Sequence, residues 1–167
     1  MKMEQRPKIK IEWDIIDKII EGLGWAFLLL LWYITISSFS SLPAIIPTHF
    51  NASGKIDDYG SRSTLFLLPA IGTLIFVGMT FLNRFPHTFN YLSKITEENA
   101  RRQYTLATKM MRYLKMIVLV IFSALAYITS TSASGKTDGP GVWFFLVLVG
   151  SIFAPLIIFI TKMAKAK

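Results

Sequence analysis

The side chains capable of ligand or acid/base chemistry gather in one short segment of the chain. They are His49, Asn51, Asp57, Asp58, Tyr59 and Arg62. Imidazole and carboxylate groups can hold a metal ion, exchange a proton or bind the polar groups of a ligand. The spacing matches no zinc signature, and three ligands would be needed, so metal binding stays undecided at this level. The sequence shows no Ser-His-Asp or phosphate-loop pattern, and we assign no catalytic residue and no cofactor.

The same residues also fit a purely structural interpretation. Asn51 and Asp57 can cap turns, while His49 hydrogen-bonds a backbone carbonyl. Three functional hypotheses stand beside it: binding of a peptide or lipid group, binding of a metal, and catalysis with His49 as a base. Residue types alone do not decide among these four.

The segment 42–63 that carries these residues is dense in conformational signals. Pro43 and Pro47 hold the chain extended. Asn51 begins a turn in which Gly54 is free to adopt a positive φ, and a second turn follows at residues 57–60. A solvated connector would not need this much specification, so we expect a compact, folded loop.

Long stretches without charge must position this loop. Four stretches of the chain contain no charged residue, and each has about the 20 residues that an α-helix needs to cross a bilayer. A backbone in lipid must form all its hydrogen bonds within the protein, which leaves helices or a closed barrel. Apolar and polar residues do not alternate along these stretches as they do in barrel strands, so we expect helices. The predicted spans lie near residues 23–41, 64–82, 116–134 and 142–161.

The composition supports the same class. The chain has 167 residues, of which 53% are hydrophobic and only 17% are charged, too apolar for one soluble domain. We therefore predict an all-α polytopic membrane protein forming a single domain over residues 1–167. The absence of cysteine excludes thiol chemistry and a disulfide scaffold. The predicted spans contain no Asp, Glu, Lys, Arg or His, which disfavours an ion-coupled pump.

The distribution of basic residues predicts the orientation. Fifteen of the 18 lysines and arginines lie in segment 1–22, in loop 83–115 or in the C-terminal tail. Because basic residues favour the cytoplasmic side, both termini are predicted to be cytoplasmic and loop 42–63 to be external. The net charge of +8 then reflects topology, and no nucleic-acid partner is expected.

The cytoplasmic segments carry their own signals. Residues 9–21 mix isoleucines with charges and predict an interfacial amphipathic helix. Pro86 should follow the end of the second helix, and Ser61 or Ser63 can cap its start. Thr96 can cap a long helix that continues as the third span, because no glycine or proline occurs from 97 to 133. Its basic residues are expected to meet lipid headgroups: Arg101, Arg102, Lys109, Arg112 and Lys115.

Two stretches of this chain resemble a known family. The first comprises Leu42-Pro43, Ile46-Pro47, His49, Asn51, Gly54, Asp57 and Gly60-Ser61, and the second comprises Asn90-Tyr91, Ile95 to Ala100 and Arg102 to Tyr104. Together they are similar to the N-terminal membrane domain of the SdpI-type family of bacterial multi-pass proteins, a domain of unknown function. Its best-described member protects a cell from its own secreted antimicrobial peptide and holds a transcriptional repressor at the membrane. That member has a further membrane-spanning half, and Arg62 stands where the resemblance predicts lysine.

The resemblance implies an integral protein of the bacterial plasma membrane that is non-enzymatic or has no assigned activity. Its outer loop would bind a peptide or envelope ligand in toxin immunity or signalling, through the six residues named at the outset. One alternative is a small oligomeric transporter or channel, since small residues in the spans would allow close contacts between subunits and a homo-oligomer. A second alternative is an outer-surface enzyme that uses His49 and Asp57.

Overall fold

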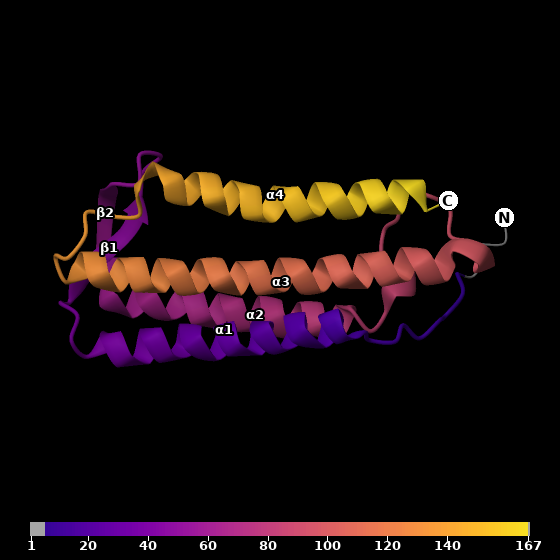
Figure 1. The fold of residues 1–167 in the computed structure, drawn as a ribbon. Coiled ribbons are helices and arrows are strands. Elements are labelled where there is room, and N and C mark those ends of the chain that lie inside the picture. The colour runs from indigo at the N-terminus through magenta and orange to yellow at the C-terminus, as the bar shows by residue number, and fades with distance from the viewer. Residues whose placement is uncertain (1–5, 167) are drawn as a thin grey trace.

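The computed structural model describes residues 6–166, which form four long helices and one two-stranded sheet (Figure 1). The helices are α1 (Ile15–Phe39), α2 (Leu67–Leu82), α3 (Glu97–Ala133) and α4 (Gly141–Lys165), and the strands are β1 (Ile45–Phe50) and β2 (Ile56–Ser61). Short 3-10 helices, η1 (Arg62–Phe66) and η2 (Pro86–Thr88), precede and follow α2. Four helical segments of the described chain are long and apolar enough to cross a membrane, which confirms the predicted spans.

Helix α3 is the centre of the bundle. It packs against α1, α2 and α4, and α1 also contacts α2. Leu31, Phe76 and Leu119 are completely buried where α1, α2 and α3 meet. The outer surface is apolar as well: Leu74 and Trp143, for example, are 74% and 75% exposed. A bundle that is apolar both inside and outside fits a hydrocarbon environment.

The predicted interfacial helix over residues 9–21 is wrong. Residues 6–14 have no helical structure, and α1 begins at Ile15 and continues without a break into the first span. A capping box sets this start, because the Asp14 carboxylate accepts the Asp17 N–H and the Asp17 carboxylate accepts the Asp14 N–H. The apolar pattern before it has another cause: Ile9 packs against the cluster around Tyr104.

The predicted capping and helix-ending residues of α2 and α3 are confirmed. Thr96 caps α3, with its hydroxyl accepting the Asn99 N–H, and the helix runs unbroken for 37 residues. Helix α2 ends at Leu82, four residues before Pro86. Ser61 caps η1, which leads into α2.

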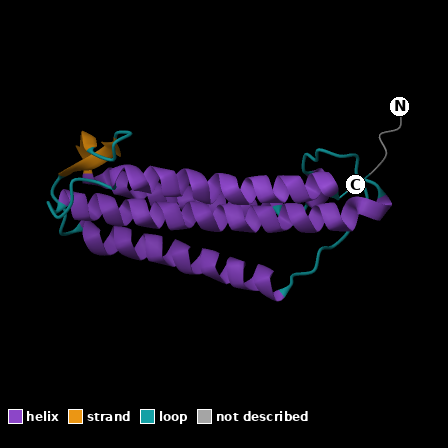
Figure 2. Ribbon diagram, turned by 45° about the horizontal axis from the view of Figure 1, so that its top comes forward, coloured by secondary structure: helices purple, strands orange, loops and turns teal. Residues whose placement is uncertain are grey.

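The loop between α1 and α2 folds as an antiparallel hairpin at one end of the bundle (Figure 2). The predicted helical fold with a compact loop is confirmed, and the loop adds a small sheet made of the strands β1 and β2. Proline at 47 and the Asp57-Asp58 pair are poor strand formers. Their presence weakened the strand signal of the β-branched and aromatic residues around them, so no strand was predicted. The hairpin tip is the predicted turn: Gly54 has φ 73° and its N–H donates to the Asn51 carbonyl at 2.8 Å.

Candidate functional site

The hairpin brings His49 and Asp57 together. The His49 Nδ1 atom lies 2.6 Å from Asp57 Oδ1, across the two strands. His49 has Asp58 as its neighbour in the strand pairing, but the register is irregular on both sides of His49, and the imidazole contacts Asp57 instead. Both side chains reach solvent, with exposed fractions of 65% for His49 and 39% for Asp57. The histidine thus has a carboxylate partner in place of the carbonyl considered from sequence.

The other predicted site residues mostly serve the hairpin itself. Asn51 Oδ1 accepts the N–H groups of Ser53 and Lys55, so Asn51 caps the turn as the structural interpretation expected. Asp58 accepts the N–H of Tyr59, whose ring is exposed.

Arg62 holds the base of the hairpin. Its Nη1 donates to the Leu42 carbonyl at 3.1 Å, and its guanidinium lies over the Phe39 ring at 4.7 Å. The structure therefore brings together His49 and Asp57 from the predicted set and gives Asn51, Asp58 and Arg62 local contacts.

A cavity of about 440 Å³ lies between the hairpin and the adjoining ends of the helices. Its apolar walls come from β1, η1, α2, α3 and α4: Ile46, Pro47, Phe50, Leu65, Leu67, Leu68, Leu125 and Phe145. Thr48, His49, Thr64 and Thr129 supply its polar lining. This arrangement of many apolar groups and few polar ones is typical of a small-ligand site.

Within residues 6–166, no three His, Asp or Glu side chains are close enough together to hold a metal ion. His49 and Asp57 consequently lack a third protein ligand from this part of the chain. The pair can orient a ligand or accept a proton.

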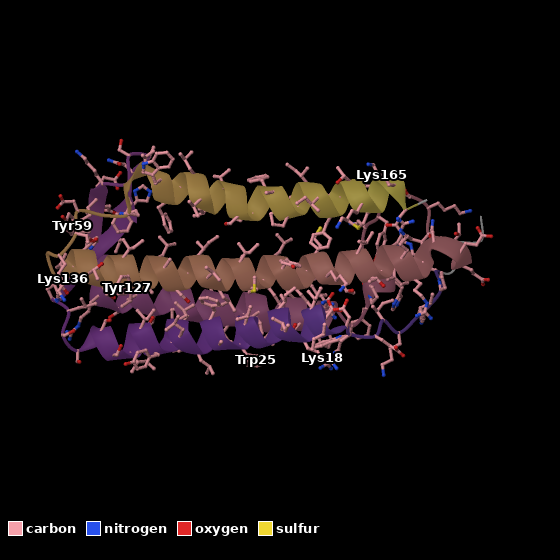
Figure 3. All side chains as sticks on the ribbon, in the orientation of Figure 1. Lys18, Trp25, Tyr59, Tyr127, Lys136 and Lys165 are labelled. Atoms are coloured by element: carbon pink, nitrogen blue, oxygen red, sulfur yellow. The ribbon has the colours of Figure 1, made fainter. Side chains whose placement is uncertain are left out.

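The opposite end of the bundle contains a cluster of six charged residues that sequence reasoning missed. Asp17 lies 3.1 Å from Arg112 Nη1, and Glu21 lies 2.6 Å from Lys115 Nζ. Lys109 pairs with Asp14 and also lies 3.4 Å from Asp17. The charged ladder, as we call these three acidic residues of the α1 end and three basic residues of α3, is electrically balanced. In Figure 3, nitrogen and oxygen atoms gather at this end while carbon dominates the middle of the bundle.

The ladder corrects the expectation for three of the five basic residues assigned to lipid headgroups. Lys109, Arg112 and Lys115 contact α1 instead, and the last two are almost completely buried. The signal was present in the spacing, since residues three or four apart share a helix face. Asp14, Asp17 and Glu21 have that spacing, and so do the three basic residues.

Local contacts explain the electrostatics of the ladder. The hydrogen bond from Lys109, followed by that from the Asp17 N–H, lowers the pKa of the Asp14 carboxyl group. Aromatic rings line the inner steps: the Arg112 guanidinium lies 4.6 Å from the Trp13 ring centre, and Lys115 Nζ lies 4.4 Å from that of Phe76. These rings shield the buried cations and add cation–π attraction.

Comparison with known proteins gives a relative over most of the chain. An uncharacterized protein of Archaeoglobus fulgidus is 33% identical over an alignment of 163 positions, and the alignment covers 85% of this chain and 84% of the relative. This chain belongs to the family of that archaeal protein. Residues 26–73 also match the model of a Domain of unknown function (DUF1648), which here runs from α1 through the hairpin into α2. No solved structure matches the chain.

The family match and the four spans establish a membrane protein that carries a domain of unknown function. Neither match names the SdpI-type family, so that resemblance stays a prediction. The relative is archaeal, and a bacterial plasma membrane likewise stays a prediction.

Proposed function

We propose that this member of the family is a membrane receptor whose hairpin end faces the cell exterior and binds an amphipathic ligand, with a secreted peptide as our first candidate. Such binding would serve toxin immunity or signalling, as the SdpI-type resemblance implies. The observation that carries the proposal is the 440 Å³ apolar cavity beneath the hairpin, which has His49 in its lining.

The cavity favours a ligand with an apolar anchor. Its volume is in the range of small-molecule sites, and most of its wall is aliphatic or aromatic. Hydroxyl groups of Thr64 and Thr129 line it as well and offer hydrogen bonds to a polar part of the ligand. An acyl chain segment or one or two apolar side chains of a peptide would suit this lining.

The His49–Asp57 pair supplies a polar contact beside the cavity. Because Asp57 engages Nδ1, the ring orientation is fixed and Nε2 is the nitrogen left for a ligand. Since His49 is a lining residue and is also exposed, one ligand could contact the imidazole and the apolar wall together.

The distribution of charge supports the proposed orientation. The described parts of the N- and C-terminal segments lie at one end of the bundle, and the hairpin lies at the other (Figure 1). Most basic residues belong to the end that carries the termini, which the positive-inside rule assigns to the cytoplasm. The hairpin would then face outward.

Neither alternative gains a comparable observation. Within residues 6–166, the hairpin cavity shares no lining residue with the cavity at the opposite end, so the two cavities do not form one passage. For a metal-dependent enzyme, the His49–Asp57 pair has no third His, Asp or Glu ligand within residues 6–166.

The test combines survival and binding. The protein is produced in a peptide-sensitive bacterium, and survival is measured against a panel of secreted membrane-active peptides. A peptide that is neutralised is then labelled and titrated against the protein in lipid nanodiscs. His49→Ala, Asp57→Ala and Leu125→Trp, which fills the cavity, should each weaken binding.

Two control substitutions separate the site from general damage. Lys55→Gln alters the exposed hairpin tip, and Leu146→Trp enlarges an exposed side chain of α4 outside the cavity. Both should bind like the wild type. Equal affinity for all five variants, or no protection and no binding across the panel, would contradict the proposal.

A further inference from the structure

A second cavity, of about 390 Å³, lies beside the charged ladder at the end that carries the termini. Its lining comes from the segment before α1, from α1 itself, from the end of α2 and from α3. The charged members of this lining are Lys10, Glu21, Arg84, Arg112 and Lys115. We propose that this cavity binds a phosphate ester, supplied either by a phospholipid headgroup or by a small soluble molecule.

The first argument is an excess of positive charge. Glu21, the acidic lining residue, is engaged by Lys115 at 2.6 Å, and Arg112 is engaged by Asp17 from outside the lining. Lys10 and Arg84 are exposed and form no ion pair with any residue in the described part of the chain. Two cations of the lining therefore have no compensating carboxylate among residues 6–166, and such an excess of positive charge attracts an anion.

The second argument is a pair of unsatisfied polar atoms in the same lining. Within the described residues, the buried Arg112 Nε has no hydrogen-bond partner, and its 3.9 Å distance to Glu21 Oε2 is too long for one. Asn83 Nδ2 donates to the Thr108 carbonyl, which fixes the amide and leaves the buried Oδ1 without a donor. Buried polar groups in native proteins nearly always have partners, so an orphan donor and an orphan acceptor on two residues of one lining favour a ligand at this cavity.

The required ligand chemistry follows from these groups. An acceptor oxygen would satisfy Arg112 Nε, and a hydroxyl would satisfy Asn83 Oδ1. A phosphate ester offers several anionic oxygens for guanidinium groups, together with a hydroxyl on the phosphate or on its alcohol. Ile9, Ile11 and Trp13 also line the cavity and can contact the carbon part of the ester. This site lies at the opposite end from the hairpin and does not rest on the proposed receptor function.

The experiment compares two double variants that lose the same charge. Lys10→Gln/Arg84→Gln removes the two unpaired cations of the lining, and Lys18→Gln/Arg101→Gln removes two exposed cations outside it. Unliganded thermal stability is measured first, to show that both variants fold like the wild type.

Two arms then distinguish the sources of phosphate. Native mass spectrometry measures binding of phosphatidylglycerol against phosphatidylcholine with the same acyl chains. Calorimetry measures binding of glycerol 3-phosphate to the protein in phosphatidylcholine nanodiscs. We expect Lys10→Gln/Arg84→Gln, the lining variant, to bind the preferred probe about tenfold more weakly than the wild type, because it loses two solvent-screened charge contacts. Lys18→Gln/Arg101→Gln, the control variant, should bind like the wild type.

A preference for phosphatidylglycerol that the lining variant loses supports a lipid headgroup as the ligand. Binding of glycerol 3-phosphate that depends on the same residues supports a soluble ester. Equal binding by both double variants, or no binding in either arm, overturns the proposal.

Discussion

The buried Asp17–Arg112 pair gives the sharpest test of the packing between α1 and α3. Its atoms are 3.1 Å apart, and the two side chains are only 2% and 3% exposed. Removing one partner of such a buried pair costs about 3–5 kcal/mol, because the other charge stays buried without compensation. For a chain of this size, each kcal/mol lowers Tm by about 2–4 °C, so either single substitution should lower Tm by about 6–20 °C.

A double-mutant cycle isolates the interaction. Asp17→Asn keeps an oxygen for the Asp14 N–H, and Arg112→Met keeps a long apolar stem next to Trp13, so each mainly removes charge. The double variant leaves neither charge isolated in this pair, and we expect it to be more stable than the sum of the singles by about 2–3 kcal/mol. Chemical denaturation in detergent micelles, followed by intrinsic fluorescence, gives the free energies.

The control for this cycle is Arg101→Met, an exposed position on α3 that should change the free energy of unfolding by less than about 0.5 kcal/mol. Two results would refute the reasoning. Single substitutions that cost less than about 1 kcal/mol would mean that the pair is hydrated, not buried. Strictly additive effects would mean that Asp17 and Arg112 do not interact.

Two further predictions concern the hairpin tip and the outer step of the ladder. Gly54→Ala should lower Tm more than Gly135→Ala. Both glycines have positive φ, but of the two only a Cβ at position 54 would collide with backbone, that of Gly141. Equal losses of Tm in thermal denaturation would show that this contact is absent. The lowered pKa of Asp14 means that its pairing with Lys109 stabilises the fold above the ordinary pKa of 3.8 and is lost as pH falls through the folded value. Asp14→Asn should therefore lower Tm at pH 6, and below pH 4 the Tm of this variant should fall less steeply with pH than that of the wild type. An equally steep fall of Tm in both proteins would contradict this prediction.

The membrane spans were predictable because their signal is local. A charge-free stretch of sufficient length specifies a helix in lipid whatever its neighbours are. The start of α3 was equally local, since Thr96 and Asn99 form a capping box within one turn, and Glu97 and Glu98 lie in that turn. The turn at Gly54 also needs no distant contact, because a positive φ there depends on the glycine itself.

What sequence reasoning missed depends on contacts between distant segments. The spacing of Lys109, Arg112 and Lys115 shows that they share a face, but not whether that face meets lipid or α1. That choice depends on the register between two helices about 95 residues apart in sequence, which brings Asp17 opposite Arg112. The isoleucines before α1 present the same ambiguity, since an apolar pattern fits a membrane surface as well as a protein surface such as the one around Tyr104.

The hairpin tip contacts the start of α4, although the domain match at residues 26–73 includes the hairpin and not α4. Helix α4 begins after Pro140, which provides no side-chain cap, so the first N–H groups of the helix need partners from elsewhere. The Gly54 carbonyl at the hairpin tip accepts one of them, the Gly141 N–H, at 3.3 Å. Gly139 allows this approach, because a Cβ there would collide with the same carbonyl oxygen. The glycine at the hairpin tip thus contacts the glycines of the α3–α4 connection. This contact closes the end of the bundle where the hairpin cavity lies.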